Sequence, residues 1–258
     1  MQAPKLALID ADLFTYDIPY SAEREDLILP FLYCIELCES RLEEILERTG
    51  CTDFKMYLTG SGNFRNELAT IQTYKGTRKR EKPFHYMNMR SWLQYRYNAE
   101  VIHGMEADDA LSIQQIQEGL NTCIVSRDKD LRMVPGWHYS YGVGKQPEKP
   151  LEYISELGYL SISSKKKLTG GGLKWFYAQC IMGDRVDNIQ GIPKAGDVLA
   201  YKTLNELQTE QELYDATSEL YNTKIGESAQ EAFMENAQLL WMIQELDQDQ
   251  KPVMWEGV

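Results

Sequence analysis

The chain has 258 residues, 43% hydrophobic and 26% charged, which is the balance of a soluble globular protein with one large domain or two small ones. No apolar run approaches the roughly 18 residues that a membrane-spanning helix needs, so a membrane partner is not expected. Five cysteines without a CxxC pair predict reduced thiols in the core of a cytoplasmic protein, and three scattered histidines argue against a zinc site.

The net charge of −12 is unevenly distributed along the chain. Residues 203–258 contain twelve Asp and Glu against Lys224 and Lys251, a net charge of −10, which leaves −2 for residues 1–202. The acidity is therefore largely a property of the C-terminal part, and it does not exclude DNA as a partner.

The first half of the chain alternates predicted strands with predicted helices. Residues 5–9 form a continuous apolar strand, residues 30–48 have the apolar spacing of a helix that ends before Gly50, and residues 54–59 form a second strand. The same patterns then predict a strand, a helix and a strand at 100–103, 106–118 and 121–126. This alternation predicts an α/β fold with a largely parallel, doubly wound sheet flanked by helices.

The second half has a different organisation. Gly170, Gly171 and Gly172 resemble a flexible linker, and residues 197–207 have the pattern of a helix. The acidic C-terminal part is helical in its periodicity. Its predicted packing residues are Phe233, Leu239, Leu240 and Trp241.

Carboxylates form four clusters along the chain: Asp10 with Asp12, Glu106 with Asp108 and Asp109, Asp128 with Asp130, and Asp184 with Asp187. Three of the clusters lie beside predicted strand ends, where the functional groups of such sheets gather. An extended chain would point Asp128 and Asp130 the same way, and a helical turn would place Asp184 and Asp187 on one face. Oxygen ligands without histidine or cysteine favour Mg²⁺ or Mn²⁺, and two such ions can promote hydrolysis of a phosphodiester.

A turn rich in glycine follows the last of these clusters. Residues 191–196 connect two predicted helices and present backbone N–H groups beside Lys194. Exposed N–H groups with one lysine form a binding site for phosphate. The alternative for this segment is a solvated Asp pair before an ordinary turn.

Three motifs then occur in order after the first strand and Asp10: EADD at 106–109, SRDKDL at 126–131 and GDRVDNIQGIPKAG at 183–196. Together they resemble the 5′-nuclease superfamily, which includes flap endonucleases, bacteriophage 5′→3′ exonucleases and the nuclease domain of bacterial DNA polymerase I. The similarity runs from Lys5 to Leu207, and the small size is most like the phage exonucleases. The resemblance implies a PIN-like sheet, a helical arch or gateway, and a C-terminal helix–hairpin–helix element that holds duplex DNA and a K⁺ ion.

The resemblance also implies one 5′-nuclease domain over 1–258, divided into a catalytic part (1–170) with a gateway (74–97), a helix–hairpin–helix part (171–207) and an acidic helical part (208–258). It implies that the metal is held, directly or indirectly, by Asp10, Glu106, Asp108, Asp109, Asp128, Asp130, Asp184 and Asp187. One position departs from the family pattern. Thr59 stands where a carboxylate commonly ends the second strand, and a hydroxyl cannot neutralise the charge of a metal ion.

Residues 74–82 are densely basic and are followed by aromatic rings, a pattern that suits a single strand or a frayed duplex end. A solvated loop is the alternative for such a run. The resemblance places the gateway here and implies that Lys75 and Arg78 neutralise charge at the phosphate being cut. The predicted DNA contacts are Arg65, Tyr74, Lys79, Arg80, Gly191, Ile192, Lys194 and Gly196.

The expected activity is Mg²⁺-dependent, structure-selective 5′→3′ exonuclease or flap endonuclease hydrolysis of DNA by a monomer in a bacterial or phage-infected cell. RNA in RNA–DNA hybrids is a further candidate substrate. One alternative is a PIN-like ribonuclease, which would not need the turn at 191–196. The other is a non-catalytic protein that binds branched DNA, although such a binder gains nothing from concentrated negative charge near phosphates.

Overall fold

The computed structural model describes residues 3–77 and 81–258, which form two compact units. Unit 1 contains the described parts of Met1–Gly62, Arg80–Asp128 and Gly136–Tyr153. Unit 2 contains those of Asn63–Lys79, Lys129–Pro135 and Ile154–Val258. Neither unit is continuous in sequence, unlike the three parts predicted above.

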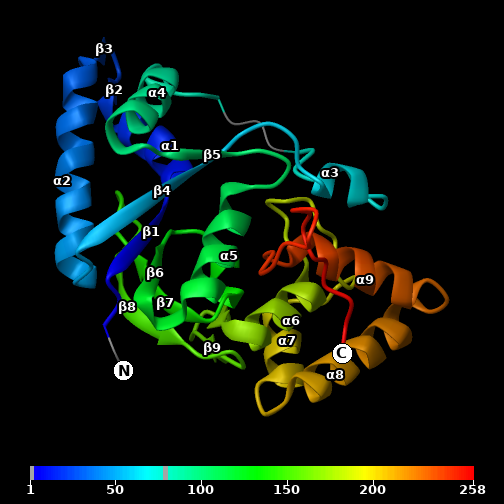
Figure 1. Ribbon diagram of the computed structural model, residues 1–258. Coiled ribbons are helices and arrows are strands. Elements are labelled where there is room, and N and C mark those ends of the chain that lie inside the picture. Colours follow the sequence, from blue (N-terminus) through cyan, green and yellow to red (C-terminus); the bar gives the residue numbers. More distant parts are fainter. Residues whose placement is uncertain (1–2, 78–80) are drawn as a thin grey trace. The chain divides into compact units, whose positions relative to one another are not determined.

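Unit 1 is built on a six-stranded sheet with the order β5-β4-β1-β6-β7-β8 (Figure 1). The strands are β1 (Leu6–Asp10), β4 (Asp53–Thr59), β5 (Glu100–Ile102), β6 (Thr122–Val125), β7 (Gly136–Ser140) and β8 (Lys149–Ile154). The pairs β1–β4, β1–β6, β4–β5 and β6–β7 are all parallel. The four strands predicted from the sequence are confirmed to within one residue, and so is the largely parallel sheet.

Helices cover both faces of this sheet. They are α1 (Ala11–Ala22), α2 (Phe31–Thr49), α4 (Tyr86–Tyr97) and α5 (Ala107–Glu118), joined by the short elements β2 (Glu23–Arg24), β3 (Leu27–Ile28) and η1 (Gly119–Asn121). Figure 1 shows α2 and α5 on opposite sides of the strands. As predicted, α2 ends directly before Gly50, which has a left-handed φ of 71° and donates its N–H to the carbonyl of Leu46.

The core of unit 1 follows the alternation of side chains along its strands. Ala7 and Ile9 of β1 share one apolar cluster with Cys34 and Cys38 of α2, while Leu8 between them is buried on the other face. All five cysteines of the chain lie within the described residues, and each is free and buried. The prediction of reduced core thiols is therefore confirmed.

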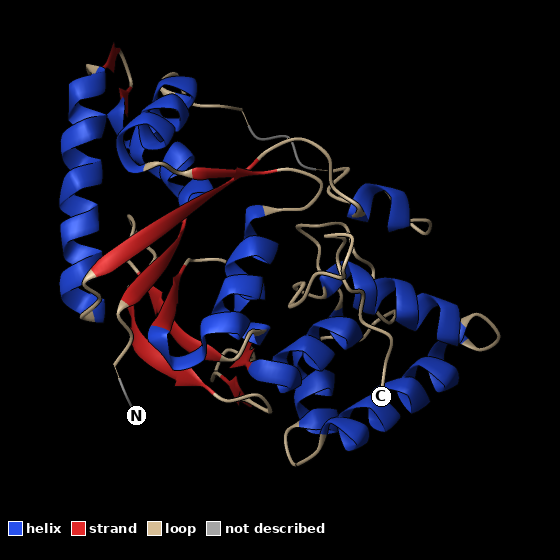
Figure 2. Ribbon diagram, in the orientation of Figure 1, coloured by secondary structure: helices blue, strands red, loops and turns tan. Residues whose placement is uncertain are grey.

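Unit 2 consists mainly of helices and loops (Figure 2). Its elements are α3 (Arg65–Leu68), η2 (Asp130–Met133), the antiparallel hairpin of β9 (Tyr159–Ile162) and β10 (Leu168–Gly171), α6 (Gly172–Met182), α7 (Asp197–Leu204), α8 (Glu210–Ile225) and α9 (Ala229–Leu240). Phe176 of the buried helix α6 packs its ring against Trp241 and Trp255 at 4.9 and 5.4 Å. Phe233, Leu239 and Leu240 are buried, so the predicted packing residues of the C-terminal part are confirmed.

The glycine-rich segment at 170–172 is not a linker, so that prediction was wrong. Gly170 and Gly171 end β10, and Gly172 begins α6. Gly172 has a φ of 67°, and a Cβ added there would lie 2.6 Å from the carbonyl oxygen of Glu156. These glycines therefore permit close packing of the backbone rather than flexibility.

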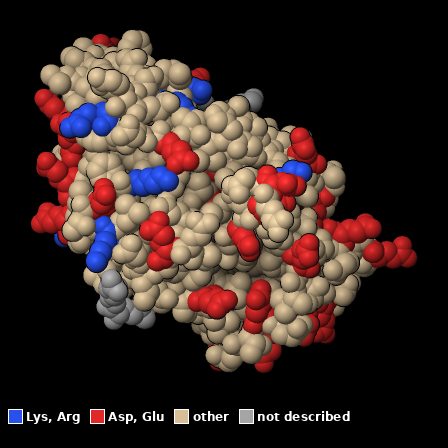
Figure 3. Space-filling view, in the orientation of Figure 1, with Lys and Arg blue, Asp and Glu red and all other residues tan. Residues whose placement is uncertain are grey.

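The acidity of the C-terminal part is a surface property. Acidic side chains cover the region of α8 and α9 in Figure 3 and are more widespread than basic ones on that face. A capping box at the start of α8 uses one of them: Glu212 accepts the N–H of Thr209 at 3.0 Å, and the Thr209 hydroxyl accepts the N–H of Glu212. Within residues 3–77 and 81–258, none of the helices has the length and hydropathy that crossing a bilayer requires.

Candidate active site

In unit 1, two of the predicted metal ligands are joined through a serine at the carboxyl ends of neighbouring strands. Asp10 ends β1, and Ser126 directly follows β6. The Ser126 hydroxyl donates to Oδ2 of Asp10 at 2.8 Å and accepts the backbone N–H of Asp128 at 3.0 Å. Because β1 and β6 are parallel neighbours, the fold brings Asp10 and the start of the Asp128 loop together.

Asp10 is in an unfavourable position for a carboxylate. Burial raises its pKa first, the charges of Asp12 and Asp128 raise it further, and the hydrogen bond from Ser126 offsets only part of the change, so that the pKa is about 7. A buried group held near two negative charges is stabilised by a cation. The donor set and its electrostatics therefore fit a divalent metal ion bound through oxygen.

This raised pKa predicts a pH-dependent stability when metal is absent. The ordinary pKa of 3.8 describes the unfolded chain, so between about pH 4 and pH 7 the folded state holds a proton that the unfolded state has lost. Stability should fall as pH rises through this window. We expect Asp10→Asn to be more stable than the wild type in EDTA at pH 8, by at most about 4 kcal/mol, and the difference to vanish near pH 4.

Thermal unfolding at the two pH values measures this effect, with Asp53→Asn as a control. Asp53 is exposed at the amino end of β4 and should show no such difference. An equal effect of Asp10→Asn at pH 4 and pH 8 would show that Asp10 is not held in a strained, charged state.

Asp12 and Thr59 form a second arrangement in unit 1. Oδ2 of Asp12 accepts the N–H of Thr59 at 2.9 Å, and Oδ1 lies 3.3 Å from a guanidinium nitrogen of Arg90. Arg90 also donates to the Thr59 carbonyl. Burial raises the pKa of Asp12, and these partners only partly offset it. The departure at Thr59 has a structural role, because its hydroxyl accepts the N–H of Ala107 at the start of α5 at 2.9 Å.

The third group of predicted ligands lies at the amino end of α5. Glu106 is the N-cap residue, and its backbone N–H donates to Oδ2 of Asp109 at 3.1 Å in a capping box. Asp109 is fully buried, whereas Glu106 and Asp108 are partly exposed. Asp109 therefore supports the helix terminus, and Glu106 and Asp108 are the side chains of this group that a ligand could reach.

Unit 2 contains the other three predicted ligands, and each has a lysine beside it. Lys129 donates to both Asp130 and Asp184. Asp187 lies 3.7 Å from Nζ of Lys75 and accepts the hydroxyl of Tyr74 at 3.1 Å. Among the described residues of the chain, no three Asp, Glu, His or Cys side chains are already arranged as a metal site.

Two geometric expectations for these carboxylates were wrong. The chain is not extended between Asp128 and Asp130, because Lys129 has helical φ and ψ of −69° and −24° and is the N-cap residue of η2. Nor do Asp184 and Asp187 share a helix face, because α6 ends at Met182 and residues 184 and 189 exchange backbone hydrogen bonds around a tight turn. Asp184 holds this turn by accepting the N–H of Val186 at 2.7 Å.

Tyr74 and Lys75 are fixed to this turn. The backbone N–H of Lys75 donates to the carbonyl of Asp187 at 2.9 Å, and Lys75 has a left-handed φ of 52°. A left-handed lysine is an uncommon backbone state that occurs often at functional positions. Tyr74, which was predicted to contact DNA, is buried, and in this structure its hydroxyl holds Asp187 instead.

The turn at 191–196 presents only part of what was predicted. Gly191 and Ile192 are buried, and the N–H of Ile192 donates to the carbonyl of Ile181 at 2.9 Å, so it is not available to a phosphate. Gly191 must be glycine, since its φ is 59° and a Cβ there would lie 2.2 Å from the nitrogen of Gly183. Lys194 and Gly196 are exposed.

Arg185 was not predicted from the sequence as a site residue. It is exposed in the turn after Asp184 and lines, together with Lys194, a pocket of about 400 Å³ whose wall also includes Thr77 and Asn188. Two cations and neutral polar groups around one hollow are suited to an anion. The signal was present in the motif GDRVDN, in which the arginine stands between two predicted ligands.

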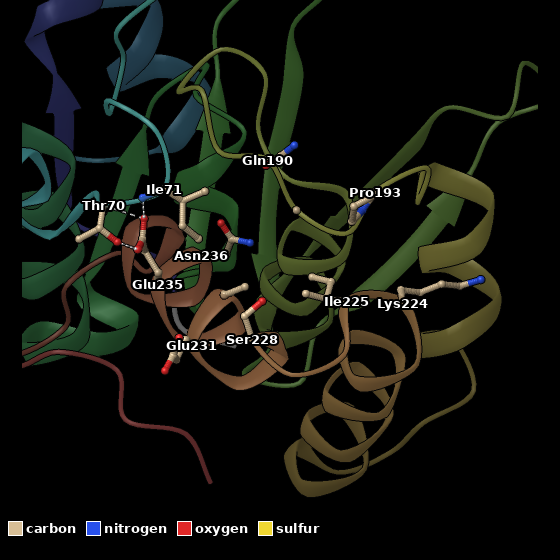
Figure 4. Close-up of a pocket in the computed structure, with 12 residues that line it drawn as sticks. Thr70, Ile71, Gln190, Pro193, Lys224, Ile225, Ser228, Glu231, Glu235 and Asn236 are labelled. Atoms are coloured by element: carbon tan, nitrogen blue, oxygen red, sulfur yellow. Dashed lines mark hydrogen bonds between the residues drawn. The ribbon is translucent and has the colours of Figure 1, made fainter.

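A larger pocket, of about 490 Å³, lies on the other side of this turn in unit 2. Figure 4 shows Gln190 and Pro193 on one wall and the residues of α8 and α9 on the other. Glu235 of α9 accepts the backbone N–H groups of Thr70 and Ile71 at 2.9 and 2.8 Å. These bonds fasten the segment that leads to Lys75.

Arg65 is fully buried and does not face solvent. Its guanidinium donates to the carbonyl oxygens of Leu239, in the last turn of α9, and of Trp241, directly after that helix, at 3.0 and 2.7 Å. A side chain used in this way cannot reach a phosphate, so the assignment of Arg65 to DNA binding is corrected. The predicted contacts Arg78, Lys79 and Arg80 lie outside the described residues.

No protein-family model matches the chain. Among curated proteins, DNA polymerase I of Bacillus caldotenax is 29% identical over 177 residues, which cover 66% of this chain and 19% of that protein. DNA polymerase I of Geobacillus stearothermophilus is 27% identical over 176 residues with the same coverage. The chain thus spans about a fifth of the length of the curated relatives it matches.

Two solved structures illustrate the similarity of this fold to known proteins. A flap endonuclease of bacteriophage T5 in complex with DNA and metal ions is similar with a TM-score of 0.58 and 14% identity, over 92% of this chain and 88% of that one. The catalytic core of Rad2 with a DNA substrate has a TM-score of 0.52 and 16% identity, over 98% and 83%. The fold is therefore that of the T5 flap endonuclease and of the Rad2 catalytic core, and it agrees with the largely parallel, helix-flanked sheet that was predicted. The helix–hairpin–helix element stays a prediction.

Proposed function

We propose that this protein is a divalent-metal-dependent 5′ nuclease that hydrolyses DNA with selectivity for a 5′ end or flap. The observation that carries the proposal is the Asp10–Ser126–Asp128 arrangement, in which a buried carboxyl with a pKa near 7 ends the central strand of a nuclease-like sheet. The names of the similar proteins agree with it, because the solved T5 enzyme is a flap endonuclease that holds DNA and metal ions.

The residues of unit 1 would hold the metal through Asp10 and Asp128, with Glu106 and Asp108 as further oxygen ligands. When bound, the divalent ion supplies activation of water and stabilisation of the departing oxygen. Ser126 orients the carboxylate of Asp10 by donating to it and holds the backbone of Asp128 by accepting its N–H. Hydrogen bonds from Arg90 and Thr59 restrict the rotation of the Asp12 side chain.

In unit 2, Asp130, Asp184 and Asp187 remain proposed metal ligands, and basic residues would bind the DNA backbone. Lys194 and Arg185 offer positive charge on an exposed surface, and Lys75 would neutralise charge on the phosphate being cut. Arg78, Lys79 and Arg80 remain proposed contacts from the sequence alone. A K⁺ ion at residues 183–196, RNA–DNA hybrids as substrates and a monomeric state also remain predictions.

The test is cleavage of three labelled substrates, a 5′-flap DNA, a single-stranded DNA and an RNA hairpin, with Mg²⁺ and with EDTA. The proposal predicts Mg²⁺-dependent release of the flap as the fastest reaction. Preference for the RNA hairpin would favour the ribonuclease alternative. Tight binding of the flap without cleavage in Mg²⁺ or Mn²⁺ would favour the non-catalytic alternative.

The role of Lys194 gives a separate prediction. Lys194→Ala should weaken duplex binding about equally for all sequences. It should also reduce the slope of the logarithm of the binding constant against the logarithm of salt concentration by about 1, because the lysine neutralises one backbone charge. Binding is measured at several salt concentrations on two unrelated duplexes. Lys145→Ala, in an exposed turn of unit 1, is the control for loss of one positive charge. A loss that depends on sequence, or no loss at all, would rule out a phosphate contact.

A further inference from the structure

Lys129 places a cation between two carboxylates that the motifs assign to metal binding. Its Nζ donates to Oδ1 of Asp130 at 2.7 Å and to Oδ2 of Asp184. The two aspartates come from η2 and from the turn after α6, so the lysine joins segments that are 55 residues apart in the sequence. An ammonium group in this position already supplies positive charge to both side chains.

The surroundings fix this arrangement. The backbone carbonyl of Lys129 accepts the indole N–H of Trp175 at 2.9 Å. Asp130 also accepts from the amide of Gln179, and Asp184 accepts the N–H of Val186. Both carboxylates are buried, whereas the Lys129 side chain is 45% exposed. The oxygens are therefore held in place, and the lysine is the member of the group that can move into solvent.

The electrostatics of this pair are opposite to those of Asp10. Burial alone would raise the pKa of Asp184, but the hydrogen bond and charge of Lys129 lower it below its ordinary value. For Asp10, burial and the charges of Asp12 and Asp128 outweigh the hydrogen bonds that lower its pKa, so the pKa stays raised. Asp10 in unit 1 is thus a buried carboxyl that an added cation would stabilise, whereas in unit 2 Lys129 already offsets part of the charge of Asp130 and Asp184.

We propose that Lys129 competes with divalent metal for the oxygens of Asp130 and Asp184 and thereby sets the metal affinity of this pair. The inference rests on the proposed metal-dependent function. An ammonium group and a divalent ion cannot occupy the same space between these oxygens, so metal binds there only after the flexible lysine side chain has moved out. Lys129 is in this sense a positioning residue, which acts through the two aspartates.

Direct binding of Mn²⁺ without DNA tests the proposal, with free Mn²⁺ measured by electron paramagnetic resonance. Lys129→Gln should bind Mn²⁺ more tightly than the wild type, on the order of tenfold, because the competing charge-assisted hydrogen bonds are gone. Lys165→Gln removes the same charge from an exposed turn of unit 2 and should leave the affinity unchanged. Adding Asp184→Asn to Lys129→Gln should abolish the gain.

Two further measurements distinguish a change in metal affinity from a change in the stability of the fold. In EDTA, Lys129→Gln should unfold at a lower temperature than the wild type, and Mn²⁺ should raise its unfolding temperature by more than it raises that of the wild type. Lys129→Arg keeps the charge and should keep the Mn²⁺ affinity of the wild type. Equal Mn²⁺ affinity of the wild type and Lys129→Gln, or tighter binding by Lys129→Arg, would overturn the inference alone. Absence of Mn²⁺ binding in every variant would overturn the proposed function as well.

Discussion

Asp128→Ala is expected to abolish cleavage of a 5′-flap in Mg²⁺ while DNA binding in Ca²⁺ persists. The substitution removes a proposed metal ligand at the carboxyl end of β6 but leaves the phosphate contacts proposed for unit 2. It also removes one of the negative charges that raise the pKa of Asp10, so the metal-free protein should keep its fold and be as stable as the wild type or slightly more so.

The matched control is Asp53→Ala, which removes an exposed aspartate at the amino end of β4 in the same unit. It should cut at the normal rate. Single-turnover cleavage and a binding assay in Ca²⁺ are measured on the same preparations. Full cleavage by Asp128→Ala in Mg²⁺ would remove this residue from the proposed metal site.

Lys75→Ala is expected to lower the single-turnover rate by about 10²–10³ and to change DNA affinity much less. The loss of one donor that stabilises charge in the transition state has an effect of this size. The backbone of Lys75 supports the assignment of this residue to the chemical step, because a hydrogen bond to the carbonyl of Asp187 holds it in an uncommon left-handed conformation. The side chain lies at the same turn, with its Nζ 3.7 Å from Oδ2 of Asp187.

Lys75→Arg tests whether the rate depends on the positive charge itself or on the particular contact of the lysine with Asp187. Arginine keeps the positive charge and should restore a large part of the rate, whereas Lys145→Ala should cut normally. If Lys75→Ala weakened binding and left the single-turnover rate unchanged, Lys75 would act in binding rather than in the chemical step.

The sequence predicted β1, β4, β5 and β6 of the unit 1 sheet, although not β7 and β8, because the signals for these strands are local. A run of apolar residues predicts β1, the spacing of apolar residues predicts α2, and Gly50 marks the end of that helix. The carboxylates beside β1, β6 and α5 followed from the rule that parallel strands share one edge. These features depend on residues that are near each other in the chain.

The errors arose where a side chain forms a hydrogen bond with a residue that is far away in the sequence. Arg65 looked like a DNA contact, but its hydrogen-bond acceptors at Leu239 and Trp241 are 174 and 176 residues away. Tyr74 is used in the same way by Asp187. Composition alone cannot tell a buried, paired cation or phenol from an exposed one.

Backbone conformation was the other source of error. The spacing of Asp184 and Asp187 fits one helix face, yet the helix ends before them and the turn gives each aspartate a different lysine. The lysine in SRDKDL was visible in the sequence, but its role was not. The partner that reveals it, Asp184, lies 55 residues further along the chain.

Cleavage of a single 5′-labelled flap by the wild-type protein is the most direct measurement of the proposed activity. The products are separated on a denaturing gel after incubation with EDTA, with Ca²⁺ and with increasing Mg²⁺. The proposed function predicts no product in EDTA and, in Mg²⁺, a short labelled fragment released at or near the junction or one nucleotide at a time from the 5′ end. An uncut flap at every Mg²⁺ and Mn²⁺ concentration, with the DNA shown to be bound, would contradict it.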